Sequence, residues 1–279
     1  MSGVFLHVVN MSISASFVAA AVLLLPLLLK KAPKWITVLL WGIVAVRLVC
    51  PITFQSALSL IPSAETISPG VIEGETPHIT SGFSTFNSLL NPIIDDAFSA
   101  EPAASANPLQ TWIPILTVVW IVGIAALLVS AAISYLRVRR KIGTAVLLCD
   151  NIYQSENVSS PFVLGLVRPK ISLPFSLNDE ESASVIAHEQ AHIRRRDHLW
   201  KPLGFLLLSV YWFNPIMWIS YVLLCRDIEL ACDEKVVGAL TPAERADYSQ
   251  VLLSCSVKRR MISACPLAFG EVSVKSRVR

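Results

Sequence analysis

Two histidines four residues apart are the residues in this sequence most suited to chemistry. His188-Glu189-Gln190-Ala191-His192 has the pattern H-E-x-x-H. In a helix this spacing places both imidazoles on one face, one turn apart, so that they can bind a single metal ion. Glu189 then points at the open coordination position, where a water molecule can be activated. The pattern predicts a Zn²⁺ site with His188 and His192 as ligands and Glu189 as the catalytic base.

A catalytic zinc site of this class needs a third protein ligand, which the H-E-x-x-H pattern does not supply. Glu229 and Asp233 lie four residues apart in a later stretch that favours a helix. We predict that Glu229 is the third ligand and that Asp233 accepts the free N–H of a ligating histidine, which would fix the ring tautomer. The alternative is a solvated acidic helix face, since Asp227 and Glu234 are close by.

Elements before the first histidine must position its helix. Residues 144–174 depart from the apolar helical pattern and contain short β-rich runs between turn signals, which predicts a small sheet. Asn178, followed by three acidic residues, is typical of a helix N-cap, so we expect the helix to begin there. An edge of the sheet, at 162–166, is where a peptide substrate would add as a strand. No individual substrate-binding residue is predicted.

The composition is that of a membrane protein. Hydrophobic residues make up 54% of the 279 positions and charged residues 15%, whereas soluble domains carry roughly 25% charged residues. Three apolar stretches are long enough to cross a bilayer, within 1–29, at 35–54 and at 111–136. Arg47 lies near the end of the second, where its side chain can reach the headgroups. A cleaved signal peptide is the alternative for the first, but its lysines follow the apolar run.

The charged residues between these stretches indicate orientation, because basic residues are retained on the cytoplasmic side. Basic residues gather after the first and third stretches: Lys30, Lys31, Lys34, Arg137, Arg139, Arg140 and Lys141. The loop at 61–110 has six acidic residues and no lysine or arginine, so we expect it outside, together with the amino terminus. This gives two transmembrane helices within 1–60, a third at 111–136, and a cytoplasmic metalloprotease region at 137–279.

The apolar run at 199–224 bears directly on the metal site. A single crossing there would place Glu229 about 30 Å from the two histidines, on the other side of the bilayer. Trp212-Phe213-Asn214-Pro215 interrupts the run, and proline disfavours a continuous helix. We therefore predict a re-entrant or interfacial hairpin whose two halves return to the same side. The rival topology is a true fourth span with no zinc site.

These features predict a mainly α-helical multi-pass membrane protein with a small cytoplasmic α+β zincin-like metalloprotease core. The six cysteines contain no C-x-x-C pair, so neither a disulfide framework nor a cysteine zinc site is indicated, and we expect buried thiols. The net charge of +3 is too small to favour a nucleic-acid partner. The basic run Arg194-Arg195-Arg196 lacks interleaved aromatic residues and fits membrane lipid better.

Further motifs extend over nearly the whole chain. They are Arg47-Leu48-Val49-Cys50-Pro51, the run at 160–171, Arg194-Arg195-Arg196-Asp197-His198, Trp212-Phe213-Asn214-Pro215 and Pro266-Leu267-Ala268-Phe269-Gly270-Glu271, beside H-E-Q-A-H and E-L-A-C-D. On these motifs the chain resembles the BlaR/MecR-type membrane metallopeptidases, bacterial signal transducers of the gluzincin group. The resemblance implies a cytoplasm-facing zinc endopeptidase that cleaves itself or a transcriptional repressor after an outside signal, in an antibiotic or cell-wall stress response.

The resemblance also implies roles for the site residues. The zinc ligands would be His188, His192 and Glu229. The catalytic base would be Glu189, and Asp233 would be the hydrogen-bond partner of a ligating histidine. Sensor members of the family continue into an outer penicillin-binding domain, whose nucleophile motif is Ser-x-x-Lys. The chain ends at Arg279 without such a motif. We therefore expect either a fragment that lacks a C-terminal sensor domain or a member that senses otherwise.

A function from a different class is left open by the sequence. The chain could be a non-catalytic membrane receptor or scaffold subunit that retains a structural metal site. Such a protein would carry less than one metal ion per chain after purification, whereas a peptidase needs a full site. Metal analysis with and without a chelator therefore separates the two hypotheses.

Overall fold

The computed structural model describes residues 2–28, 33–50, 108–158 and 160–257, together with Ser88 and Pro92. The chain is mainly helical, with one small mixed sheet. The helices that position the site or cross the molecule are α1 (Ser2–Leu28), α2 (Lys34–Val49), α5 (Pro108–Lys141), α6 (Asp179–Arg194), α7 (Asp197–Val210), α8 (Pro215–Val237) and α9 (Pro242–Val257). The expected outer loop, apart from Ser88, Pro92 and its last three residues, and the motif at 266–271 lie outside the described residues.

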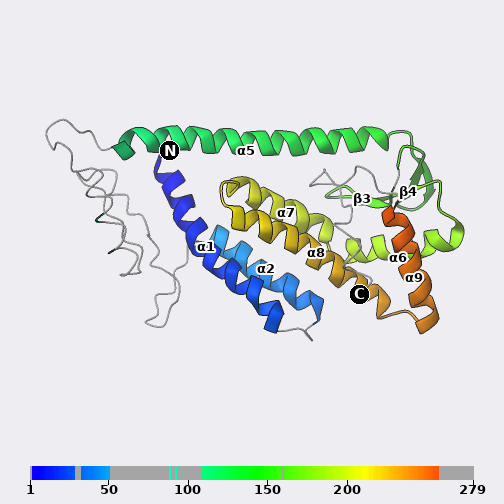
Figure 1. The fold of residues 1–279 in the computed structure, drawn as a ribbon. Helices are drawn as coiled ribbons and strands as arrows, with labels where there is room; N and C mark the ends of the chain where they lie inside the picture. The colour runs from blue at the N-terminus through cyan, green and yellow to red at the C-terminus, as the bar shows by residue number, and fades with distance from the viewer. Residues whose placement is uncertain are drawn as a thin grey trace.

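Two of the described helices are long and apolar enough to cross a membrane: Ser2–Leu25 within α1, and Thr111–Lys141 within α5. Figure 1 shows α5 running along one side of the molecule, and most of its side chains are exposed. Val118 and Val122, for example, are 61% and 60% exposed. Contiguous apolar surface of this extent indicates a lipid environment.

The second expected span is shorter than the sequence suggested. Helix α2 has 16 residues, ending at Val49, and positions 51–54 of the predicted span lie outside the described residues. A helix of this length is about 24 Å long, which is less than the roughly 30 Å of a bilayer core. The described part of the chain therefore supports two membrane helices, and the multi-pass prediction is not confirmed.

Helices α1 and α2 pack side by side and against α8 (Figure 1). Ala15 and Ala19 of α1 are fully buried, because small side chains let neighbouring helices approach closely. The indole N–H of Trp41 in α2 donates a buried hydrogen bond of 2.8 Å to Asp227 Oδ2 in α8. Lys34 donates its backbone N–H to Glu234 Oε2 at 2.7 Å. These contacts fix α2 along the helix that carries the predicted third ligand.

The predicted small sheet at 144–174 is confirmed. Its strands are β1 (Val146–Cys149), β2 (Ile152–Ser155), β3 (Phe162–Leu164) and β4 (Lys170–Pro174), in the order β1-β2-β4-β3. The pair β2–β4 is parallel and the other two pairs are antiparallel. Val163, Ile171 and Leu173 are fully buried and pack with Val185 of α6. The sheet therefore supports the helix that carries the two histidines.

Helix α6 begins where the sequence predicted. The side chain of Asn178 accepts a hydrogen bond of 2.7 Å from the Glu181 N–H, and Glu181 accepts one of 3.2 Å from the Asn178 N–H, which completes a capping box. The helix ends at Arg194, and Arg196 then adopts a left-handed conformation with φ of 60°. This sharp turn redirects the chain from α6 into α7.

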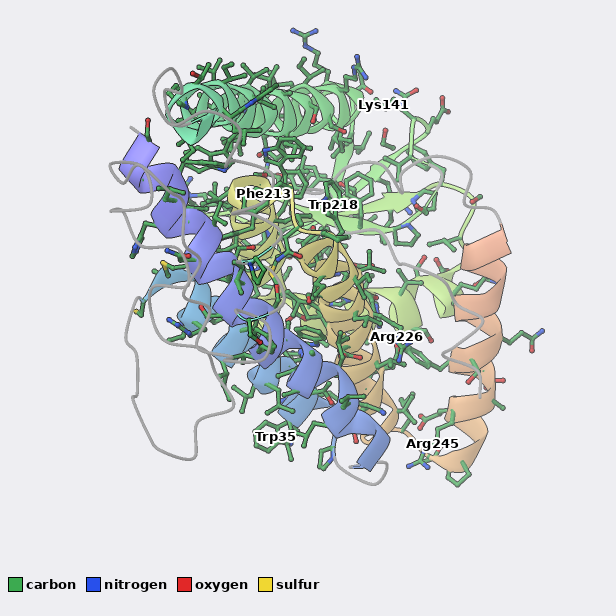
Figure 2. All side chains as sticks on the ribbon, turned by 60° about the vertical axis from the view of Figure 1, so that its left-hand side comes forward. Trp35, Lys141, Phe213, Trp218, Arg226 and Arg245 are labelled. Carbon is green, nitrogen blue, oxygen red and sulfur yellow. The ribbon has the colours of Figure 1, made fainter. Side chains whose placement is uncertain are left out.

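Helices α7 and α8 form a hairpin that turns at residues 211–214, where the sequence predicted a break. Pro215 occupies the first turn of α8, and the side chain of Asn214 caps it by accepting from the Ile216 N–H at 2.9 Å. Helix α7 has 14 residues and is about 21 Å long, too short to cross a bilayer core. Figure 2 shows Phe213 at the turn, near α5, and Arg226 further along α8.

The outer surface of this hairpin is apolar. Its exposed large side chains are Leu199, Trp200, Leu203, Leu206, Trp218, Ile219 and Val222. A patch of this size on a helical pair fits contact with lipid better than contact with water. That the hairpin enters the bilayer without crossing it stays a prediction.

Candidate metal centre

The hairpin brings the predicted third ligand to the two histidines. His188 and His192 lie one turn apart on α6, and their Nε2 atoms are 3.1 Å apart. Glu229 of α8 places its Oε2 atom 3.8 Å from His188 Nε2 and 3.6 Å from His192 Nε2. All three side chains are buried. Residues 37 to 41 positions apart in the chain therefore converge on one point.

The spacing of these three atoms suits a metal ion. A triangle whose sides are 3.1, 3.6 and 3.8 Å has its centre about 2 Å from each corner. Zinc binds imidazole nitrogen and carboxylate oxygen at about 2.0 to 2.2 Å. The two nitrogens and the oxygen could thus hold one ion with little movement.

The outer ring nitrogen of His192 is held by a residue that the sequence analysis did not identify. Asp197 Oδ2 lies 2.8 Å from His192 Nδ1, and Arg195 Nε donates to the same oxygen at 3.2 Å. A carboxylate only accepts hydrogen bonds, so Nδ1 carries a hydrogen and Nε2 is the nitrogen that a metal can bind, in place of a proton. The left-handed turn at Arg196 brings Asp197 back to the histidine, and spacing in the sequence gives no sign of that turn.

His188 is held by a similar network from α8 and α9. Tyr248 Oη lies 2.8 Å from His188 Nδ1 and donates its own hydrogen to Asp233 Oδ1 at 3.0 Å. Asp233 Oδ1 itself lies 3.4 Å from His188 Nδ1. The predicted contact between Asp233 and a ligating histidine is thus mediated mainly by Tyr248. This tyrosine was missed because no motif links α9 to the site.

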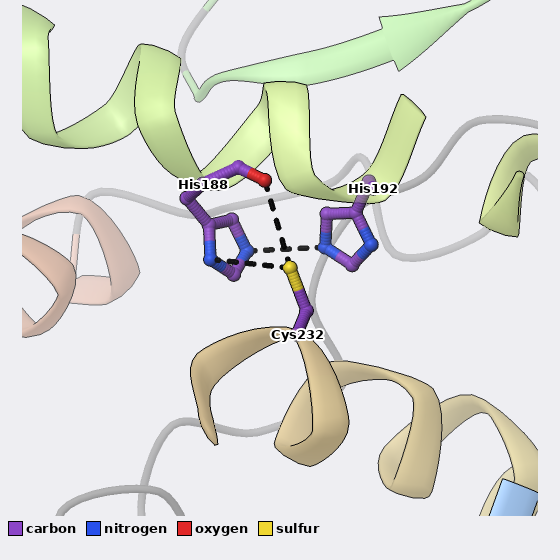
Figure 3. Close-up of side chains that lie close together, drawn as sticks. All are labelled: His188, His192 and Cys232. Atoms are coloured by element: carbon purple, nitrogen blue, oxygen red, sulfur yellow. Dashed lines mark hydrogen bonds between the residues drawn. The ribbon is translucent and has the colours of Figure 1, made fainter. Parts of the chain in front are cut away.

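Cys232 is a further group at the centre that the sequence analysis treated as an ordinary buried thiol. His188, His192 and Cys232 offer ligand atoms within 4.8 Å of one another, and Figure 3 shows the thiol below the two rings. Its Sγ atom lies 3.8 Å from His188 Nδ1 and 3.6 Å from the His188 carbonyl oxygen. Because His188 Nδ1 already contacts Tyr248, the nitrogens left for a metal are the two Nε2 atoms. Glu229 Oε2 lies near both of them, which favours Glu229 over Cys232 as the third donor.

Lys201 of α7 balances the charge of Glu229. Its Nζ atom lies 2.5 Å from Glu229 Oε1, and both side chains are buried. The pair uses one carboxylate oxygen and leaves the other, Oε2, on the side of the histidines. A buried carboxylate without such a partner would be very costly, so Lys201 helps to keep Glu229 ionised and able to bind a cation.

The electrostatics of the site favour positive charge. Burial by itself lowers the pKa of His188, but hydrogen bonds with Cys232 and Glu229 outweigh it and raise the pKa to about 9. Burial opposes the charged form of His192 in the same way, and the charge of Glu229 raises the pKa well above its usual value. Burial raises the pKa of Glu229, whereas Lys201 and His192 bring it well below the usual range. The buried carboxylate of Glu229 thus stabilises a positive charge at the two histidines, either a proton or a metal ion.

Glu189 follows His188 on α6, the helix of the two histidines. The side chain is 5% exposed, and its Oε2 atom has no hydrogen-bond partner among the described residues. A buried carboxylate oxygen without a protein partner needs a water, an ion or a substrate group to satisfy it. Its position therefore fits a base that acts on a bound molecule.

Comparisons with known proteins agree with this geometry. A family model described as BlaR1 peptidase M56 matches residues 6–279. The methicillin resistance mecR1 protein of Staphylococcus aureus is 31% identical over 136 residues, which cover 46% of this chain and 23% of that protein. The regulatory protein BlaR1 of Bacillus licheniformis is 27% identical over 188 residues, 57% of this chain and 31% of that protein.

The matched stretches span less than a third of either relative. The family model, in contrast, covers nearly all of the chain, including both helices that converge on the metal centre. The resemblance that the sequence motifs indicated is confirmed, and the chain belongs to the BlaR1 peptidase M56 family.

Proposed function

We propose that the chain is a zinc-dependent endopeptidase of the membrane, with Glu189 as its catalytic base. The observation that carries the proposal is the convergence of His188 Nε2, His192 Nε2 and Glu229 Oε2 at distances that suit one ion. The family model supports a peptidase, and the buried Glu189 supplies the base that such a reaction needs.

The residues that would hold the ion are His188, His192 and Glu229, and zinc bound there would polarise the scissile carbonyl and lower the pKa of a water molecule to about 7. Glu189 would accept the proton of the attacking water and pass it to the leaving amine. Asp197 and Tyr248 would hold the two imidazoles in the tautomer that leaves Nε2 available.

We further propose that the site faces the cytoplasm and that the amino terminus lies outside. Figure 1 shows the carboxyl end of α5 at the same end of the molecule as α6 and α9, and Lys34, after α1, donates its backbone N–H to Glu234 near the end of α8. The end of α5 carries Arg139, Arg140 and Lys141, which are typical of a cytoplasmic flank. The metal centre lies at this basic end, because α6 contacts both α8 and α9 there.

The substrate that we propose is a protein, either a transcriptional repressor or the chain itself. The relatives are named as a methicillin resistance protein and a regulatory protein, which supports a role in controlling antibiotic resistance. Strand β3 is an edge strand of the sheet and contacts α6, so a substrate peptide added to it would lie near the metal centre.

The decisive experiment is Glu189→Gln, which removes the base but keeps the size of the side chain. We expect cleavage to fall by about 100- to 10,000-fold, the usual contribution of a general acid–base residue, while metal content stays at one ion per chain. Peptide fragments from cells that express the parent chain and the variant should be compared by mass spectrometry, and metal measured on the purified proteins.

The matched control is Glu156→Gln, because Glu156 is exposed in the sheet region and takes no part in the site. It should cleave like the parent chain. Equal cleavage by Glu189→Gln and Glu156→Gln would exclude Glu189 as the base. Substoichiometric metal in the parent chain, with no cleavage, would instead favour the receptor or scaffold function.

A further inference from the structure

A groove of about 560 Å³ lies between the end of α5 and the sheet, away from the metal centre. Its polar lining consists of two tyrosines and three basic residues, Tyr135, Tyr153, Arg139, Arg168 and Lys170. Arg139 comes from α5, whereas Arg168 and Lys170 come from the β3–β4 connection and the start of β4. Segments about thirty residues apart in the chain therefore contribute positive charge to one hollow.

The groove is electropositive. No acidic residue lines it, and no carboxylate pairs with Arg139, Arg168 or Lys170 among the residues that the structure describes. All three side chains are exposed, and Lys170 Nζ lies over the ring of Tyr153, 4.4 Å from its centre. Three cations around one hollow, with two tyrosines in the same lining, match the donors that bind a phosphate group.

The position of the groove places it at the level of lipid headgroups. Helix α5 is a candidate membrane span, and its apolar residues give way to basic ones from Arg137 onward. Figure 2 shows Lys141 at the end of this helix, beside the sheet. Basic residues directly after a membrane helix lie in the headgroup region of the cytoplasmic leaflet, where anionic lipids concentrate.

The loop at the rim of the groove has an apolar tip. Val167 is 92% exposed and Leu166 is 48% exposed. The tip is held in shape, because Gly165 adopts a φ of 112° that a side chain would strain, and Asn151 Nδ2 donates to the Pro169 carbonyl oxygen at 3.1 Å. Exposed apolar residues next to cations fit a lipid surface better than a soluble anion.

From this arrangement we infer that the groove binds the phosphate of an anionic phospholipid, with Arg139, Arg168 and Lys170 as its donors and the tip at Leu166 and Val167 inserted among the acyl chains. The lipid would join the end of the membrane helix to the sheet that supports α6. The inference rests on α5 as a membrane helix and is independent of the proposed peptidase activity.

The test is native mass spectrometry of the full chain in detergent, with added phosphatidylglycerol or phosphatidylcholine. We expect the parent chain to retain one phosphatidylglycerol in preference to phosphatidylcholine. A variant with Arg139→Gln, Arg168→Gln and Lys170→Gln should bind phosphatidylglycerol about 100-fold more weakly, since each basic residue near an anionic surface contributes a several-fold factor. The charge-preserving variant Arg139→Lys, Arg168→Lys and Lys170→Arg should bind like the parent.

The matched control removes the same charge from the same helix end but outside the groove, through Arg137→Gln, Arg140→Gln and Lys141→Gln. It should retain the lipid. Equal losses in both triple variants would show diffuse attraction to the bilayer and overturn the site. Displacement of the lipid by inorganic phosphate or by an acidic peptide would likewise overturn it, in favour of a soluble anion or a protein partner.

Discussion

Helix α5 exposes apolar side chains, whereas the contact between α6 and α8 buries polar ones. Along α5, apolar residues such as Val118 and Val122 are exposed. Between α6 and α8, polar and charged groups are buried: His188, Glu189, His192 and Glu229 are each at most 5% exposed. In a water-soluble domain both patterns would be unfavourable. The exposed apolar face of α5 fits contact with lipid, and the buried polar cluster fits the cation site that we propose for the α6–α8 contact.

The two regions also differ in how precisely they constrain their residues. Lipid is a uniform apolar solvent, so an exposed position on α5 accepts almost any apolar side chain. The buried polar cluster must satisfy every donor and acceptor with particular partners. Substitutions in the cluster should thus have larger effects than substitutions on α5, and these effects should depend on metal.

The largest expected effect follows from Lys201→Met. This change leaves the buried carboxylate of Glu229 without its cation, which should destabilise the metal-free chain by about 3 to 5 kcal/mol. With zinc present the loss should be smaller, because the ion compensates the same charge. Thermal unfolding in detergent, followed by circular dichroism with and without zinc, measures both values.

Lys235→Met is the matched control for this comparison, since Lys235 is an exposed residue of α8. It should change the unfolding temperature little under either condition. If zinc did not reduce the loss caused by Lys201→Met, the link between the Lys201–Glu229 pair and a cation site would be wrong.

The pH dependence of metal binding should come next in size. Because the pKa of His188 is raised to about 9, a bound metal must displace a proton at any lower pH. Apparent zinc affinity should therefore rise about tenfold per pH unit, for each proton displaced, between pH 6.5 and about 9. Titration against a chromophoric chelator measures it.

The stability of the metal-free chain should fall, and not rise, as the pH increases. A histidine whose folded pKa is raised contributes stability that is complete below its unfolded pKa of 6.5 and is lost as the pH rises through about 9. Zinc affinity that stayed constant over this interval would contradict the raised pKa of His188.

Asp197→Asn should weaken zinc binding by about 10- to 100-fold, the usual cost of changing a group that orients a ligating histidine. The neutral amide holds the Nδ1 hydrogen of His192 less strongly than the carboxylate does. Tyr248→Phe should have a smaller effect, because Asp233 still lies 3.4 Å from His188 Nδ1. Competition titrations give both affinities, with the exposed Asp247→Asn as a control. A larger loss from Tyr248→Phe than from Asp197→Asn would reverse the assigned importance of the two networks.

The smallest expected effect lies on α5, at its contact with the hairpin. A Cβ atom at Gly123 would lie 2.3 Å from Cε2 of Trp212, and the Trp212 indole donates to the Trp120 carbonyl oxygen at 3.2 Å. Gly123→Ala should therefore cost about 1 to 3 kcal/mol. Gly42→Ala, which meets no atom within 4 Å, should cost nothing. Equal unfolding temperatures for the two variants would place the hairpin tip away from α5.

Several features could be predicted because they depend on neighbours in the chain. The H-E-x-x-H spacing puts two histidines on one helix face wherever the helix lies. Asn178 caps α6 through residues three positions away, and Pro215 begins α8 because it cannot continue α7. Apolar length alone identified α1 and α5 as candidate membrane helices.

Other features could not be predicted because they depend on contacts between helices. Lys201, Asp197 and Tyr248 join the site from three separate positions, and none belongs to a metal-ligand spacing. The end of α2 at Val49 was also missed, because the predicted apolar stretch continues to residue 54 and composition alone does not mark where a helix ends. These are consequences of packing, which composition does not encode.

The sequence by itself determined which groups are available to this protein: two imidazoles four residues apart, the carboxylate of Glu189 between them, a second carboxylate pair, and a break in the apolar run before that pair. The tertiary structure decided which atoms meet. Local patterns act over one or two helical turns, whereas the α7–α8 hairpin brings Glu229 to within 4 Å of both histidines and places Lys201 on its other oxygen. Only burial of all these groups together makes their charges interdependent, because water no longer screens them.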